Sequence, residues 1–211
     1  MQTEIITKNT LTRAAEIIKS GGLAAVPTET VYGLAADGLN ACAVAEIYEV
    51  KNRPEQKAIS LLVSGMDMAA EFCADIPDAA RALANAFWPG PLTMILKKRE
   101  IVPGIVTAGG DTVGVRCPKH DLTLELIRLA DTPLAAPSAN ISGQPSPKSA
   151  RDVLEYFDGK IDCVVDGGQC EVGIESTIVD LSVTPPRILR QGGLLREEIA
   201  QVLNTVGLSL Q

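Results

Sequence analysis

The sequence predicts an α/β domain in which helices flank a mixed β-sheet. Apolar residues alternate along the chain between helical spacing and short continuous runs typical of buried strands. Some predicted strands follow one another directly, which favours a sheet with both parallel and antiparallel pairs. With 211 residues, 46% of them hydrophobic, and no evident linker, we expect a single domain over residues 1–211 that ends in a short helical tail at about 194–211.

The first half of the chain shows three helical faces separated by apolar runs. Thr10 and Asn40 are favourable N-caps, and Gly21 can close the first helix. Pro27 and Pro89 end a strand and a helix because proline lacks a backbone N–H. The expected helical faces are Leu11–Ile18, Ala41–Tyr48 and Ala80–Phe87, and the expected strands are Leu23–Val26 and Ile59–Val63.

The second half continues the pattern with more strands than helices. Its apolar runs are short, and turn-forming residues separate them. The expected strands are Leu92–Leu96, Val113–Val115, Leu134–Ala136, Cys163–Val165, Thr177–Leu181 and Arg187–Leu189, and the expected helices are Leu122–Leu129, Ser149–Phe157 and Glu197–Leu203.

The overall charge limits the class of ligand. The formal net charge is -7, and the chain has only seven aromatic residues (three Phe, three Tyr and one Trp). Proteins that bind nucleic acid broadly are usually basic, so direct binding of tRNA is expected to be absent or weak, while a nucleotide remains possible. No apolar run approaches the roughly 20 residues that cross a bilayer, and the amino terminus lacks a signal segment. We therefore expect a cytoplasmic protein with no membrane partner.

The cysteines and the single histidine give no metal motif. The five cysteines show no C-x-x-C spacing, so we expect reduced, mostly buried thiols without a catalytic role and no bound metal. His120, within Pro118-Lys119-His120-Asp121, is expected to be a surface turn residue.

Polar and charged groups gather where the first strand ends and after the second helix. The segment PTETVYGL contains Thr28 and Tyr32, and the segment KNRP contains Lys51 and Arg53. Arginine offers a planar fork that pairs with phosphate or carboxylate, whereas lysine acts as a mobile point charge. A small polar substrate could bind here beside a phosphate group. A capped turn followed by a solvated charged turn is the alternative.

Further polar positions follow later strands. Ser138 and Asn140 come after an apolar strand, Ser176 opens another, and Arg190 ends the last one. Groups at the carboxyl ends of strands are well placed for ligands in open sheets, although Asx-type turns would explain some of them. Two or more cations with several hydroxyls suit phosphoryl chemistry, and the familiar glycine-rich phosphate loop is absent.

The ordered motifs PTETVYGL, KNRP, WPGPLT, PSANISGQPSP, GIESTIVD and ILRQG resemble the YrdC-type family of L-threonylcarbamoyladenylate synthases. The resemblance covers about residues 11–203. It implies a YrdC-like catalytic domain with a twisted, mixed open sheet and a large central cleft. It also implies synthesis of threonylcarbamoyl-AMP and pyrophosphate from L-threonine, bicarbonate and ATP, with Mg²⁺ accompanying ATP. A separate transferase complex would then modify tRNA.

The resemblance also implies roles for individual residues. Thr28 and Tyr32 would contact threonine. Lys51 and Arg53 would be the catalytic cations at the triphosphate and carboxylate. The adenylate phosphate and nucleoside would be held by Ser138, Asn140, Ser176 and Arg190. Some longer members carry a histidine where this chain has Leu62.

Two other functions fit the same fold. One is an RNA-binding module that makes no adenylate, which the acidic charge and sparse aromatics oppose. The other is a carbamoyl-adenylate enzyme that uses carbamoyl phosphate, as in larger hydrogenase-maturation proteins, whose additional domains have no room here.

Overall fold

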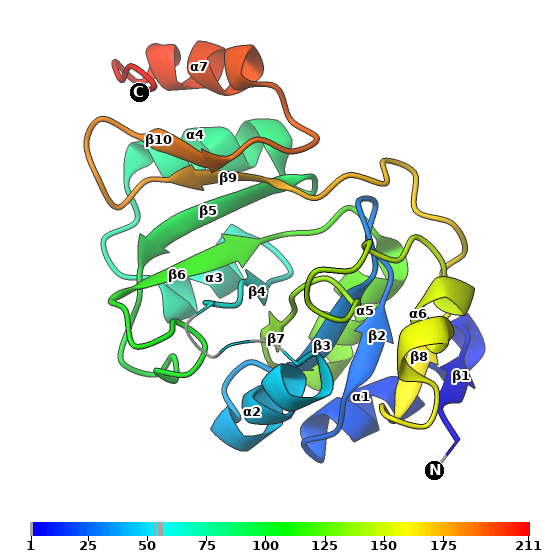
Figure 1. Ribbon diagram of the computed structural model, residues 1–211. Helices are drawn as coiled ribbons and strands as arrows, with labels where there is room; N and C mark the ends of the chain where they lie inside the picture. The colour runs from blue at the N-terminus through cyan, green and yellow to red at the C-terminus, as the bar shows by residue number, and fades with distance from the viewer. Residues whose placement is uncertain (1, 53, 55–56) are drawn as a thin grey trace.

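The computed structural model describes residues 2–52, 54 and 57–211 and shows helices around a ten-stranded mixed sheet (Figure 1). The strand order is β1-β8-β2-β3-β7-β4-β6-β5-β9-β10, which confirms the predicted α/β class with a mixed open sheet. The strands are β1 (Glu4–Ile6), β2 (Ala24–Val26), β3 (Gly33–Asp37), β4 (Leu61–Leu62), β5 (Leu92–Lys97), β6 (Thr112–Arg116), β7 (Leu134–Ala135), β8 (Cys163–Val165), β9 (Thr177–Asp180) and β10 (Arg187–Arg190). The helices are the 3-10 helix η1 (Lys8–Thr10) and α1 (Leu11–Lys19), α2 (Ala41–Val50), α3 (Met66–Phe72), α4 (Asp78–Phe87), α5 (Asp121–Ala130), α6 (Ala150–Phe157) and α7 (Arg196–Thr205).

Both kinds of strand pairing occur within this sheet. β1 and β2 run parallel to β8, and β5 runs parallel to β9. The hairpin partners β2 and β3 are antiparallel, as are β5 and β6. The two termini lie at opposite ends of the molecule (Figure 1).

Two hydrophobic clusters hold the helices against the sheet. The smaller one joins α1 to α5, where Ile18 and Leu126 are fully buried. The larger one contains Leu83 of α4 and Leu203 of α7, so the helical tail packs on the domain. Aliphatic side chains supply most of both clusters, as the scarcity of aromatic residues requires.

Several expected helix caps can be checked directly. Asn40 caps α2 as predicted, because its side chain accepts hydrogen bonds from two backbone N–H groups. Gly21 closes the region after α1 with a φ of +88°. The prediction for Thr10 is wrong in its mechanism, since its side chain makes no cap hydrogen bond to α1. Its hydroxyl accepts from the N–H of Thr7 instead, at the start of η1.

The sequence pattern missed β1, the 3-10 helix η1, β3 and α3, and it overestimated β4. β1 is three residues long, and β3 is the run Gly-Leu-Ala-Ala-Asp, whose small residues have weak strand preference. The strand expected at Ile59–Val63 is reduced to Leu61–Leu62, because its two flanking residues bond individually to Val106 and Arg116.

This architecture brings together loops and strand ends from separate parts of the sheet. They include the loop between β2 and β3, the end of β6, the turn after β7 and the start of β9. Thr28, Ser138 and Ser176 lie at these places, whereas Lys51 follows α2 and Arg190 ends β10. Across the described part of the chain, no helix is both long enough and apolar enough to cross a bilayer.

Candidate active site

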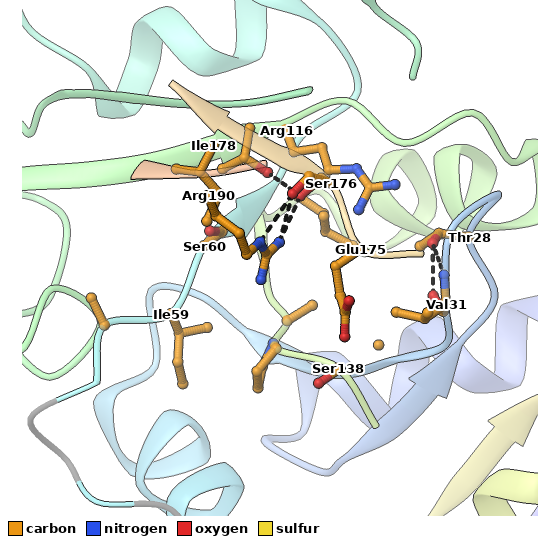
Figure 2. A pocket seen from close by; sticks show the side chains of 16 residues that line it. Thr28, Val31, Ile59, Ser60, Arg116, Ser138, Glu175, Ser176, Ile178 and Arg190 are labelled. Carbon is orange, nitrogen blue, oxygen red and sulfur yellow. Dashed lines mark hydrogen bonds between the residues drawn. The ribbon is translucent and has the colours of Figure 1, made fainter. Parts of the chain in front are cut away.

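A cavity of about 210 Å³ lies where these loops and strand ends meet (Figure 2). This volume is below the roughly 300–1,000 Å³ typical of ligand pockets, so a nucleotide would extend beyond it. Its charged and hydroxyl-bearing lining residues are Thr28, Ser60, Thr93, Arg116, Ser138, Glu175, Ser176 and Arg190. Its other lining residues are Val31, Gly33, Ala58, Ile59, Leu62, Ala136, Pro137 and Ile178.

Arg116, at the end of β6, is the buried cation of this pocket. Its guanidinium lies 2.9 Å from the Glu29 carboxylate, and the two side chains are only 9% and 4% exposed. It also donates to the hydroxyl of Thr30 at 2.8 Å and to the carbonyl of Gly90 at 3.3 Å. Glu29 Oε2 accepts in addition from the N–H of Lys119. These contacts fix the orientation of the guanidinium at the pocket wall.

Thr28 folds the preceding loop into a tight turn. Its hydroxyl accepts from the N–H groups of Thr30 and Val31 and donates to the carbonyl of Val31 at 2.7 Å. The hydroxyls of Thr28 and Thr30 lie 2.8 Å apart. A chain of contacts thus runs from Thr28 through Thr30 to Arg116, and Thr28 is oriented rather than mobile.

Ser176 and Arg190 form the second polar group of the pocket. The hydroxyl of Ser176 lies 2.8 Å from that of Thr93 on β5. Arg190 on the edge strand β10 donates to the Ser176 carbonyl at 2.9 and 3.1 Å and to its hydroxyl at 3.1 Å. Figure 2 shows this guanidinium beside Ser176 and above the pocket. An oxyanion placed here would meet both a cation and a hydroxyl.

Ser138 and Asn140 belong to one ordered loop after β7. The Ser138 hydroxyl donates to Asn140 Oδ1 at 2.5 Å, and Asn140 Nδ2 donates to the carbonyls of Ile141 and Gln144. Lys51, which is only 1% exposed, donates from Nζ to the carbonyls of Ser138 and Asn140. The lysine therefore fixes the position of this loop through hydrogen bonds to two of its carbonyl groups.

Tyr32 lies outside the lining of this pocket, and its expected contact with threonine stays a prediction. Its side chain is fully buried, and its hydroxyl donates to the carbonyl of Gly168 at 2.9 Å and accepts from the N–H of Gly167 at 3.1 Å. Burial raises its pKa to about 12. Tyr32 is outside the pocket lining and ties β3 to the segment that leads to Glu175 and Ser176.

The structure brings together only part of the predicted set. Thr28, Ser138, Ser176 and Arg190 line the pocket, and Asn140 supports it by bonding to Ser138. Lys51 and Tyr32 lie behind the lining, and Arg53 lies outside the described residues. The sequence pattern did not predict Arg116, Ser60 or Thr93 as site residues. Arg116 had a usable signal, because it is a charged residue directly after the apolar run Val113–Val115.

The single histidine and the five cysteines lie outside the lining of this pocket. The prediction that His120 is a surface turn residue is wrong, because it is half-buried and its Nδ1 has no partner among the described residues. Burial lowers its pKa. All five cysteines are free, three of them buried, as predicted. Within residues 2–52, 54 and 57–211, no group of three or more His, Cys, Asp or Glu side chains could hold a metal ion.

Comparison with known protein families shows to which family the chain belongs. A model of the Sua5/YciO/YrdC domain, described as telomere recombination, matches residues 16–192. The chain belongs to the Sua5/YciO/YrdC family. This membership confirms the resemblance that the motifs predicted.

Individual members of the Sua5/YciO/YrdC family agree closely with the chain. It is 49% identical to the threonylcarbamoyl-AMP synthase of Pyrococcus abyssi over 92% of its own length, and 41% identical to that of Bacillus subtilis over 93%. The crystal structure of P. abyssi Sua5 complexed with L-threonine matches with a TM-score of 0.94 at 44% identity, over 100% of this chain and 63% of that chain. The chain spans 57% of the length of each of the two synthases.

Proposed function

We propose that this chain catalyses the synthesis of threonylcarbamoyl-AMP and pyrophosphate from L-threonine, bicarbonate and ATP. The observation that carries the proposal is the convergence of two guanidinium groups and five hydroxyl-bearing side chains on one pocket. The synthase names of relatives that are 41–49% identical support it. The amino acid and ATP would both place anionic groups in this pocket.

The two arginines divide these anionic groups between them. Arg116 is oriented by Glu29 and is connected through Thr30 to Thr28, so we assign it the threonine carboxylate. Arg190 donates to the Ser176 hydroxyl at the pocket and belongs to the edge strand, so we assign it and Ser176 the adenylate phosphate. An arginine fork can pair with two oxygens of either group.

The serine loop would position the nucleotide. Ser138 lines the pocket, and its hydroxyl, which here donates to Asn140 Oδ1, would turn to donate to a phosphate oxygen when the nucleotide binds. We assign Lys51 the role of positioning this loop, because it holds two of the loop carbonyls. Arg53 is proposed to neutralise charge on the triphosphate, as the family resemblance implies. Fixed donors of this kind stabilise a developing charge without reorganising during the reaction.

The reaction would proceed through a carbamate. The neutral amine of threonine attacks the carbon of bicarbonate, and water leaves. Alternatively it attacks the carbon dioxide formed from bicarbonate, and a proton leaves; both routes give the carbamate. A carbamate oxygen then attacks the α-phosphorus of ATP, and pyrophosphate departs with the bonding electrons. Mg²⁺ would enter with ATP and offset phosphate charge. The chain's own residues align the carbamate with the phosphorus, and alignment of two reactants can supply a large part of the rate.

The product requires a further step elsewhere. We propose that a separate transferase complex moves the threonylcarbamoyl group to tRNA, and that the reaction takes place in the cytoplasm. The acidic chain would contact tRNA weakly or not at all. We also propose that residues 1–211 act as one catalytic domain, since α7 within the tail at about 194–211 packs through Leu203 into the main cluster.

Pyrophosphate release gives a direct test. We expect release from ATP only when L-threonine and bicarbonate are both present, because they form the nucleophile together. Equal release when either one is omitted would identify a plain ATP pyrophosphatase. Binding of RNA at physiological salt without any release would instead favour the RNA-binding alternative.

A further inference from the structure

Glu175 is the one acidic side chain among the described residues that line the pocket. It precedes β9, and Figure 2 shows its carboxylate extending between Arg190 and the Thr28–Val31 turn, toward Ser138. A negative charge is unexpected in a pocket proposed to hold a nucleotide and bicarbonate, because like charges repel strongly where water is partly excluded. Its presence therefore needs a cationic partner.

No cation among the described residues supplies that partner by direct contact. None of the ion pairs within 4.0 Å among the described residues includes Glu175. The nearby Arg190 directs its N–H groups to Ser176. Glu175 Oε1 accepts a hydrogen bond from the Ser146 hydroxyl at 2.7 Å. That bond fixes the carboxylate and, as the main cause, lowers its pKa, so Glu175 is ionised near neutral pH.

Only one of the proposed substrates carries a positively charged group. ATP and bicarbonate are anions, whereas free threonine carries an ammonium group. We propose that the Glu175 carboxylate binds the ammonium group of the amino acid substrate and so selects an α-amine. This inference rests on the proposed function. With Arg116 assigned to the carboxylate, the zwitterion would be held at both charged ends.

A metal ion is the competing partner for this carboxylate. Mg²⁺ prefers nearly ideal octahedral oxygen coordination and is usually held by one or two carboxylates together with substrate phosphates. Glu175 has no second acidic side chain beside it in the described lining, and one of its oxygens already accepts from Ser146. An ammonium needs only one acceptor oxygen here, so the observations favour the amine.

The ionised state also limits what Glu175 does. A carboxylate with a lowered pKa is a weak acceptor for the ammonium proton, because an efficient general base has a pKa near the working pH. Glu175 therefore orients the amine and determines specificity. Loss of the amine proton is left to solvent or to bicarbonate.

The test is the binding of L-threonine by calorimetry without nucleotide or Mg²⁺. We expect Glu175→Gln to weaken binding roughly 10- to 100-fold, the range for loss of a charge-assisted hydrogen bond. Glu175→Asp, which keeps the charge on a shorter side chain, should fall between it and the wild type. The matched control is Glu171→Gln, an exposed carboxylate four residues away and outside the lining, which should bind as the wild type does.

Two further measurements make the result specific. Affinity for Mg²⁺-ATP should not fall in Glu175→Gln, because a neutral amide repels the phosphates less than a carboxylate does. The analogue 2,3-dihydroxybutanoate, which lacks the amine, should bind the wild type far more weakly than threonine does, and Glu175→Gln should lose most of this preference. Circular dichroism would confirm that each variant is folded.

The possible failures are distinct. Unchanged threonine affinity in Glu175→Gln would overturn the inference while leaving the proposed function intact. Weakened Mg²⁺-ATP binding with unchanged threonine affinity would identify a metal ligand instead, and would also overturn it. A wild-type protein that binds Mg²⁺-ATP but no threonine would refute the proposed function itself.

Discussion

Replacing Arg116 by methionine should destabilise the fold as well as abolish synthesis. Methionine keeps much of the length and apolar volume of the arginine stem but removes its charge. The Glu29 side chain is only 4% exposed, and it would then have no cation beside its Oε2. Its Oε1 already lacks a hydrogen-bond partner among the described residues. An unpaired buried charge is the main cost of such a change.

The expected loss of folding stability follows from the burial of this ion pair. Breaking a buried ion pair by removing one partner costs about 3–5 kcal/mol. Taking 4 kcal/mol and a urea m-value of about 2.5 kcal/mol/M, the unfolding midpoint should fall by about 1.6 M. The double variant Glu29→Gln/Arg116→Met should recover much of the stability, because the buried charge is gone. It should stay inactive, since the cation proposed to bind the threonine carboxylate is still missing.

Urea unfolding followed by circular dichroism is the assay, and Arg13→Met provides the control. Arg13 lies 3.4 Å from Glu4, and the two side chains are 54% and 47% exposed, so its loss should leave the midpoint close to that of the wild type. A midpoint for Arg116→Met within experimental error of the control would refute the view that the pair is buried and mutually dependent. Failure of Glu29→Gln to restore any stability would show that the contacts to Thr30 or Gly90 matter more than the charge.

Three further predictions concern other parts of the molecule. Tyr32→Phe should lower the free energy of unfolding by about 1–2 kcal/mol, because the backbone groups of Gly167 and Gly168 lose their partner; an unchanged urea midpoint would contradict this. Exposed Cys42 should react with a thiol reagent in the folded protein. Buried Cys73, whose pKa burial raises to about 12, should react only after unfolding. Equal reaction rates for the two thiols in the folded protein would contradict the burial of Cys73. In competition assays kcat/KM should decrease in the order threonine, serine, alanine, with serine roughly 10–200-fold below threonine for one missing methyl; equal values for serine and alanine would mean that no group in the pocket reads the hydroxyl.

Much of the fold was predictable from local pattern. Helices such as α4 and α5 have apolar residues at helical spacing, and the strongly apolar strands β5 and β8 stand between turn-forming residues. β3 was not predictable in the same way, because its small residues become a strand only by pairing with β2 and β7 on either side. The strand order is likewise a property of long-range pairing, which periodicity does not encode.

The site residues likewise divide into those that the sequence predicted and those that it did not. Motif order identified the family, and Thr28, Ser138, Ser176 and Arg190 were predicted as site residues before the pocket that contains them was known. Lys51 and Tyr32 were predicted in the right region, but which atoms they contact depends on the folded loops. Arg116 and Glu175 were not assigned, because their importance comes from burial and from neighbours distant in the sequence.

The most direct test of the central claim is mass spectrometry of the product formed from ATP, L-threonine and isotopically labelled bicarbonate. The proposed function predicts a species with the mass of threonylcarbamoyl-AMP that carries the label, together with pyrophosphate. It also predicts that this species is absent when threonine is omitted. Formation of AMP and pyrophosphate without a labelled threonine adduct, under conditions in which a known synthase yields it, would contradict the proposal.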